Sequence, residues 1–111
     1  MRKFKTIKIP DSVTRIGQFA FSHCKNLTSV TLGNHVTKIH NKAFFDCDRL
    51  TSIVIPKSVI SINECAFGYY VNLDKFEIEK VPNFKIYCFK DTVGEKYAIE
   101  NGFDYELIDK K

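Results

Sequence analysis

The stretch NKAFFDCDRLTSIVIPKSV, residues 41–59, combines an Ala-Phe pair, a lone Cys and a Leu with a short β-branched run. No single helix or strand accounts for this order of residues. Compared with the rest of the chain, the stretch aligns with GQFAFSHCKNLTSVTLGNHV, residues 17–36, at a period of 23 residues. Because self-similarity at a fixed period is typical of repeat architectures, the sequence predicts a repeat protein.

Apolar residues of one class recur at this period along most of the chain. The repeated positions include the Ala-Phe pair, the Leu before the β-branched run and two positions within that run. They also include a Val and an Ile after the run. Such columns predict side chains that stack on one another inside a solenoid. The columns are Ala20, Ala43 and Ala66; Phe21, Phe44 and Phe67; Phe4, Leu27, Leu50 and Leu73; Ile7, Val30, Ile53 and Phe76; Ile9, Leu32, Ile55 and Ile78; Val13, Val36 and Val59; and Ile16, Ile39 and Ile62.

Each repeat predicts a short strand, a turn, a second extended segment and a closing turn. The motifs LTSVTL (27–32) and LTSIVI (50–55) alternate apolar and polar residues as a half-buried strand does. Gly33-Asn34 and Pro56-Lys57 mark the turns after these strands. VTKI and VISI then predict the second extended segment, and NKAFFDC a single helical turn that closes the coil. One such unit cannot bury its apolar face alone, but units stacked about 4.8 Å apart can.

This order of motifs resembles the BspA-like class of leucine-rich repeats. The signature of that class, a strand followed by IP, SV, I, AF, C and L, is met in IPDSVTRIGQFAFSHCKNL and IPKSVISINECAFGYYVNL. The resemblance covers residues 4–78 and implies a leucine-rich repeat solenoid of β-rich right-handed coils, with a parallel sheet on one face and short helical turns. The sequence departs from the signature at Tyr70, which stands where Cys24 and Cys47 do, and at Gly33, which replaces a proline.

Residues 79–111 form a second predicted part, in which the repeat fades. They contain an extended piece around Phe84 to Phe89, and then a helix signal with Asp91 or Thr92 as its N-cap and Asn101-Gly102 as its C-cap. FDYELI predicts a closing strand. A stack of repeats needs a terminal cap with a polar outer side, and we expect this helix and strand to be that cap.

The exposed face of the predicted sheet is the candidate partner-binding site. Within each strand motif the residues between the apolar columns face solvent, and leucine-rich repeats commonly bind partners on this face. The face is expected to change from basic through hydroxyl-rich to mixed charge, without a Trp or Tyr anchor. The candidate residues are Lys5, Thr6 and Lys8; Thr28, Ser29 and Thr31; Thr51, Ser52 and Val54; and Asp74, Lys75 and Glu77.

The four cysteines are predicted to be buried free thiols. Cys24 and Cys47 lie one period apart, and so do Cys65 and Cys88. Stacked Cβ atoms lie near the strand spacing of about 4.8 Å, whereas a disulfide requires about 3.8 Å, so bridging would pinch the coil. A disulfide, or a metal site with His23, is the alternative, although no Cys-x-x-Cys spacing supports zinc.

Composition and motifs exclude several classes of function. The chain has 17 Lys and Arg against 13 Asp and Glu, and this mild basicity does not indicate a nucleic-acid partner. No run approaches the about 18 apolar residues of a membrane span. No spacing unites a Ser or Cys with a His and an acid, and no Gly-rich loop indicates a phosphate cofactor. We therefore expect no enzyme activity, cofactor, metal site or membrane insertion.

Three functions from different classes fit the sequence. The first is a protein-protein interaction or adhesion module that binds through the sheet face. For this function the BspA-like resemblance implies a cell-surface or secreted location, since members are often bacterial or protozoan surface proteins, although no signal peptide is seen. The second is a structural spacer or fragment of a longer solenoid with no ligand of its own. The third, an enzyme, would need a pocket, and short solenoids offer flat or gently curved faces.

The first coil has an open side. Its apolar residues need a neighbour on both sides, yet only residues 1–3 precede Phe4. An uncapped coil exposes a sheet edge, which is a template for pairing with another chain. We expect either further repeats before Met1 or self-association in which the first strands, residues 4–9, of two chains pair symmetrically. Lys3, Lys5 and Lys8 oppose that pairing by placing positive charge at the edge.

Overall fold

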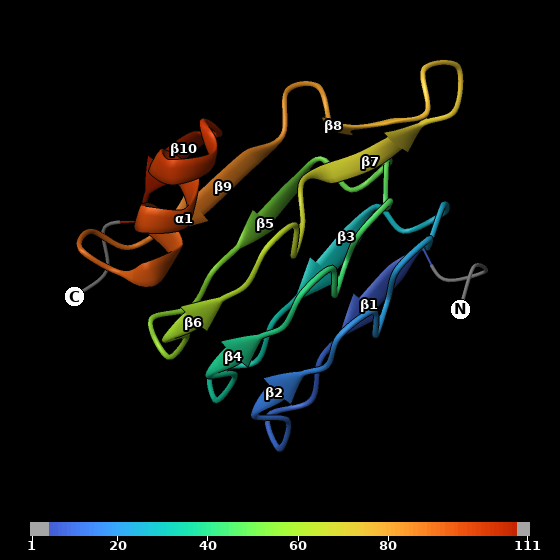
Figure 1. The fold of residues 1–111 in the computed structure, drawn as a ribbon. Helices are drawn as coiled ribbons and strands as arrows, with labels where there is room; N and C mark the ends of the chain where they lie inside the picture. The colour runs from blue at the N-terminus through green and yellow to red at the C-terminus, as the bar shows by residue number, and fades with distance from the viewer. Residues whose placement is uncertain (1–4, 109–111) are drawn as a thin grey trace.

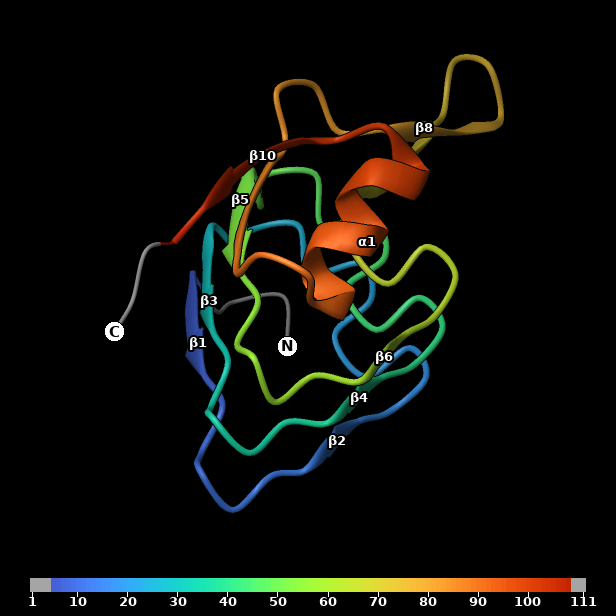
Figure 2. The ribbon, with the colours of Figure 1, turned by 90° about the vertical axis from the view of Figure 1, so that its left-hand side faces the viewer.

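The computed structural model describes residues 5–108 and shows coils stacked along one axis, as the period predicts (Figure 1). Each of the first three coils contributes one short strand to each of two rows, which lie on different sides of the solenoid (Figure 2). The first row contains β1 (Thr6–Lys8), β3 (Ser29–Thr31) and β5 (Ser52–Val54). The second row contains β2 (Arg15–Ile16), β4 (Lys38–Ile39) and β6 (Ser61–Ile62).

The strands pair in parallel, and their register follows the repeat. Ile7 of β1 is opposite Val30 of β3, and Ile16, Ile39 and Ile62 align across β2, β4 and β6. In the first row β3 lies beside β5, while the hydrogen-bonded sheets are β1–β3 and β5–β9–β10. The predicted leucine-rich repeat solenoid with parallel sheets is thereby confirmed.

The apolar columns form one continuous core. The column residues of the second and third coils are buried except Ile62, which is partly buried. In the first coil Ile9 and Ile16 are buried, whereas Ile7, Val13 and Phe21 are partly buried. The rings of Phe21 and Phe44 stack at a centroid distance of 5.2 Å. The buried columns are Leu27 and Leu50; Val30 and Ile53; Leu32 and Ile55; Val36 and Val59; Ile16 and Ile39; Ala43 and Ala66; and Phe44 and Phe67.

The segment that closes each coil is tighter than a regular helical turn. Ala43 N–H donates to His40 O, and Phe45 N–H to Lys42 O, so two hydrogen-bonded turns follow each other. Between them the backbone is left-handed, a conformation that non-glycine residues seldom adopt. This conformation recurs at the repeat period, in Phe19, Lys42 and Cys65 (φ 61°, 55° and 55°) and in His23 and Asp46 (φ 60° and 63°).

The predicted fourth repeat strand at Leu73 to Ile78 is wrong, because a hairpin interrupts the repeat there. β7 (Tyr69–Asn72) pairs antiparallel with β8 (Glu77–Lys80), and the hairpin projects from the solenoid (Figure 1). Leu73 and Phe76 are 73% and 86% exposed instead of buried. The strand that continues the first row is β9 (Lys85–Cys88), in which Lys85 is opposite Ser52, 33 residues earlier.

The C-terminal helix and strand close the stack, as predicted. Helix α1 (Val93–Asn101) follows β9 and ends at Gly102, whose N–H reaches the carbonyls of Ala98 and Ile99. The left-handed backbone of Gly102 (φ 71°) then lets Phe103 N–H donate to Ala98 O. β10 (Asp104–Leu107) then pairs in parallel with β9. The helix packs closely on the core: a side chain at Gly94 would come within 2.9 Å of Ile55.

Candidate functional site

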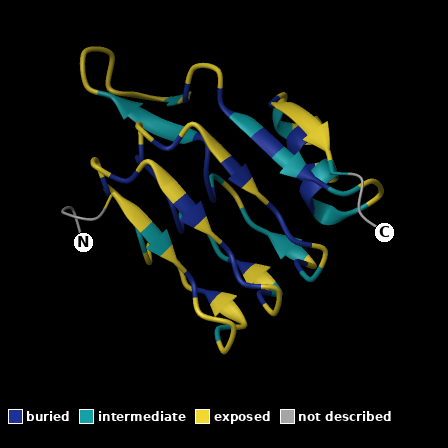
Figure 3. Ribbon diagram, turned by 180° about the vertical axis from the view of Figure 1, so that it is seen from behind, coloured by how far each residue is buried: buried dark blue, intermediate teal, exposed yellow. Residues whose placement is uncertain are grey.

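The outer face of the first strand row is flat and exposed. All nine predicted face residues of the first three coils are exposed, whereas the apolar residues that alternate with them are buried or, at Ile7, partly buried (Figure 3). The parallel register sets them in rows across the strands: Thr6 lies beside Ser29, and Lys8 beside Thr31. These nine residues are Lys5, Thr6, Lys8, Thr28, Ser29, Thr31, Thr51, Ser52 and Val54.

The remaining predicted face residues, Asp74, Lys75 and Glu77, do not belong to this surface. They lie in and beside the turn of the hairpin, where Lys75 Nζ is 3.5 Å from a carboxylate oxygen of Glu79. The repeat pattern predicts them in the sheet because the flanking residues Leu73 and Phe76 fall in register with the repeat.

Strands β9 and β10 supply the part of the face that the sequence reasoning missed. Lys85 is opposite Ser52 and Asp104, and Tyr87 is opposite Val54 and Glu106. Lys85 donates to Glu106 at 2.9 Å, and this hydrogen bond raises the pKa of the lysine. The Lys85 ammonium also lies 5.2 Å from the Tyr87 ring centroid. The face therefore has an aromatic residue, contrary to the expectation that it lacked one.

A hollow of about 450 Å³ adjoins this face where the strands end. Its lining combines apolar side chains with the polar residues Asn34, Lys57 and Ser58, and the Lys57 ammonium lies over the ring of Phe89 at 4.9 Å. Val54 belongs both to the flat face and to the hollow, so the two form one surface. The lining residues are Leu32, Asn34, Val54, Pro56, Lys57, Ser58, Phe89 and Ile108.

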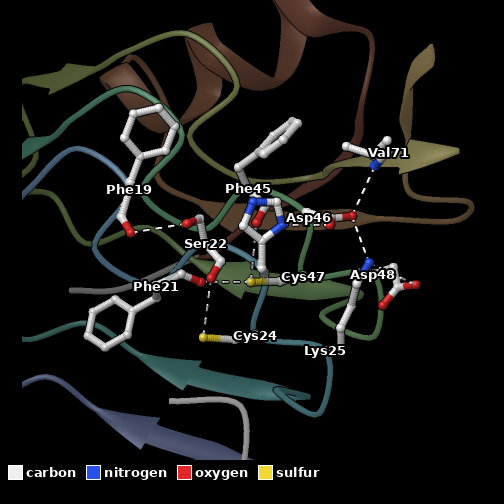
Figure 4. A network of polar contacts seen from close by, with 11 residues as sticks. Phe19, Phe21, Ser22, Cys24, Lys25, Phe45, Asp46, Cys47, Asp48 and Val71 are labelled. Atoms are coloured by element: carbon white, nitrogen blue, oxygen red, sulfur yellow. Dashed lines mark hydrogen bonds and ion pairs between the residues drawn. The ribbon is translucent and has the colours of Figure 1, made fainter. Parts of the chain in front are cut away.

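A polar cluster around Asp46 lies among the closing turns (Figure 4). Its carboxylate, in a residue only 6% exposed, lies 2.7 Å from His23 Nδ1 and accepts hydrogen bonds from Lys25 Nζ at 2.8 Å and from Val71 N–H at 3.0 Å. Burial raises the pKa of Asp46, but the hydrogen bonds from Lys25, Val71 and His23 outweigh it and bring the pKa below its ordinary value. The hydrogen bonds of the cluster connect the first coil, the second coil and the hairpin. The role of the cluster is therefore to stabilise the fold.

No disulfide joins the four cysteines within residues 5–108, and the prediction that all four are buried is correct for three of them but wrong for Cys65. Cys24, Cys47 and Cys88 are buried, whereas Cys65 is half-exposed. The Cys47 thiol donates to the Phe21 carbonyl at 3.1 Å, and burial raises its pKa to about 12. Cys88 lies in β9 opposite Leu107 and so belongs to a different column from Cys65. Residues 5–108 contain no group of His, Cys, Asp and Glu side chains that could hold a metal ion.

In the described part of the chain, no helix has the length and apolar character that crossing a bilayer requires. No curated protein and no solved structure matches the chain significantly. The family model of the BspA type Leucine rich repeat region (6 copies) matches residues 1–105. Because this match spans nearly the whole chain, and the structure has the stacked parallel coils of such repeats, the chain belongs to the BspA-type leucine-rich repeat family.

Proposed function

We propose that this chain is a non-catalytic protein-interaction module that binds a protein partner through the exposed face of β1, β3, β5 and β9. Leucine-rich repeats are protein-interaction scaffolds, and family membership supports this class of function. The observation that carries the proposal is the continuous exposed face, whose strands lie over buried apolar columns that should restrict their motion. A rigid face lowers the entropic cost of ordering the binding surface.

The chemistry of the face suits a polar protein surface with an apolar anchor. Its centre carries hydroxyl groups from both Thr and Ser, which donate and accept hydrogen bonds. Tyr87 and Val54 provide apolar contact next to the hollow, and aromatic residues are common among the dominant contributors to binding energy. We further propose adhesion at a cell surface or in a secreted protein as the setting, because surface and secreted proteins are common in this family.

A capture experiment tests the proposal. The wild-type chain is compared with a face variant, Ser29→Glu with Ser52→Glu, and with a control, Ser12→Glu with Gln18→Glu, that adds the same charge at exposed positions outside the strand row. We expect the wild type and the control to retain the same protein, and the face variant to lose it. Equal retention by all three would contradict binding through this face, and retention of nothing by the wild type would favour the structural spacer.

A further inference from the structure

The first strand row has an open edge at each end. β1 pairs only with β3, and β10 only with β9, among the strands of residues 5–108. The two strands stand at opposite ends of the row, and their outward residues are exposed (Figure 3). All four residues of β10 are exposed, including Tyr105 and Leu107 at 37% and 42%. The C-terminal strand therefore closes the core and also presents an unpaired edge of its own.

The backbone groups at these two edges have the complementary arrangement found inside the solenoid. Lys85 N–H donates to Thr51 O, and Ile55 N–H to Tyr87 O. The earlier strand therefore bonds through residues that alternate with its outward-facing Ser52 and Val54, and the later strand through its own outward-facing residues, Lys85 and Tyr87. Ile108 N–H donates to Cys88 O, which leaves the backbone groups of Tyr105 and Leu107 on the open side of β10. Lys5 O and Ile9 N–H bond to β3, which leaves the groups of Thr6 and Lys8 on the open side of β1. β10 thus offers the edge of an earlier strand, and β1 that of a later one.

The two ends also carry opposite charge. Residues 5–23, which form the first coil, contain three basic residues and one acidic residue, whereas residues 89–108 contain two basic and five acidic residues. On the outer face the contrast lies in the edge strands themselves: β1 carries Lys8 and follows Lys5, while β10 carries Asp104 and Glu106.

We propose that a second copy of this chain binds head to tail, with its β1 added to β10 as the next parallel strand of the row. Continuing the register of the solenoid places Glu106 beside Lys8 of the second copy, and Asp104 beside its Thr6 and close to its Lys5. The Lys85–Glu106 hydrogen bond within one chain shows that this face supports a lysine of one strand bonded to a glutamate of the next. Tyr105 and Leu107 then lie beside Ile7 and Ile9 and cover apolar side chains at both ends.

Head-to-tail pairing fits the charges better than symmetric pairing of two first strands. Two copies of β1 joined antiparallel would bring Lys5 and Lys8 of both chains onto one face, and like charges across a strand pair are destabilising. Head-to-tail contact is heterologous, so each bound copy leaves one free end and the assembly extends until a ring closes.

Charge-reversed variants test this arrangement by sedimentation velocity from micromolar to millimolar concentration. The first variant, Asp104→Lys with Glu106→Lys, has two basic ends, and the second, Lys5→Glu with Lys8→Glu, has two acidic ends. The control, Asp74→Lys with Glu77→Lys, makes the same charge change as the first variant on the hairpin, away from both edges. Circular dichroism melts check that each variant is folded, and because the two test variants alter different ends, one misfolded variant leaves the other informative.

We expect the average mass of the wild type and of the control to rise with concentration above 12.8 kDa and beyond that of a dimer. Each test variant alone should associate at least about tenfold more weakly, and mixing the two should restore assembly because every junction then joins opposite charges. Molar salt should weaken the wild-type association by screening these exposed charges. The proposal is overturned if the wild type stays monomeric throughout, or if the first variant still dimerises, as symmetric pairing of β1 would allow.

Discussion

The imidazole Nδ1 of His23 lies 2.7 Å from Oδ2 of Asp46, one repeat later in the chain. Both residues have left-handed backbone, and His23 N–H donates to the carbonyl of Phe45. Parallel stacking sets corresponding positions of successive repeats side by side, so this contact is a direct product of the 23-residue register. It also brings a carboxylate within reach of the Val71 N–H, where the hairpin begins.

Replacing Asp46 with Asn should destabilise the fold by about 1 to 3 kcal/mol, since charge-assisted hydrogen bonds are worth more than neutral ones. Asn tolerates the left-handed backbone at this position, so the loss reports the hydrogen bonds and not backbone strain. Denaturant unfolding measures it. The exposed Asp48 is the control, because Asp48→Asn removes the same charge two residues away, and it should cost less than about 0.5 kcal/mol. Equal costs for the two variants would contradict the role assigned to Asp46.

The Asp46 carboxylate should also add a pH dependence to stability. An Asp in the unfolded chain becomes protonated at about pH 3.9. The pKa of Asp46 is lowered in the folded chain, so its protonation there requires a lower pH. The unfolded state therefore binds more protons as the pH falls, so the contribution of Asp46 is present above about pH 4 and is lost below it. Unfolding free energies of the wild type and Asp46→Asn should converge as the pH falls through this range, and a constant difference would contradict the assignment.

Truncation of Phe44 should cost about 3 to 5 kcal/mol, because its ring is fully buried between adjacent coils. Thr31→Ala, on the exposed face, should cost far less. Chemical denaturation of the two variants tests the assignment of inner and outer faces. Similar losses for both would show that the faces are wrongly assigned.

Phe76 occupies the same repeat column as Val30 and Ile53, yet it should behave as a surface residue. Its side chain is 86% exposed in the hairpin turn, so Phe76→Ala should change the unfolding free energy by less than about 0.5 kcal/mol. Ile53→Ala is the matched comparison from the same column and should cost about 2 to 5 kcal/mol. A cost for Phe76→Ala close to that of Ile53→Ala would mean that the repeat continues through residues 73–78.

The comparison of Phe76 with Ile53 shows where sequence reasoning succeeds and where it ends. The period placed Val30, Ile53 and the other core columns of the second and third coils correctly, because every coil must bury the same positions against its neighbours. The period misplaces Phe76, because an apolar residue at this position fits the repeat pattern whether its side chain packs in the core or is exposed to solvent. The alternation in KIYCF was visible at residues 85–89, but a count of residues cannot show that a hairpin lets β9 pair with β5.

The Asp46 cluster could not be predicted for a different reason. His23 and Asp46 are one period apart, which is a usable signal, but the sequence does not show that Lys25 and Val71 N–H reach the same carboxylate. The hydrogen bond from Val71 exists only because the hairpin starts beside the second coil. Contacts that depend on a break in the repeat cannot follow from the repeat itself.

The cysteines should remain reduced and should react at different rates. Burial raises the pKa values of Cys47, Cys65 and Cys88, and for Cys47 the value reaches about 12. Because the thiolate is the reactive form, alkylation of the folded chain near neutral pH should be slow, with the half-exposed Cys65 reacting first. All four thiols should react after unfolding without reductant. Mass spectrometry of the intact chain checks this, and a loss of two or four hydrogens would reveal disulfides.

The exposed face continues from β5 directly to β9, which gives it Lys85 and Tyr87 in place of the hairpin residues. Nuclear Overhauser contacts between backbone protons measure this register directly, since paired strands lie about 4.8 Å apart. The structure predicts contacts that join residues 52–54 to residues 85–87. Contacts that join residues 52–54 to residues 75–77 instead would contradict this register, because they would restore an unbroken 23-residue repeat and the hairpin would not exist.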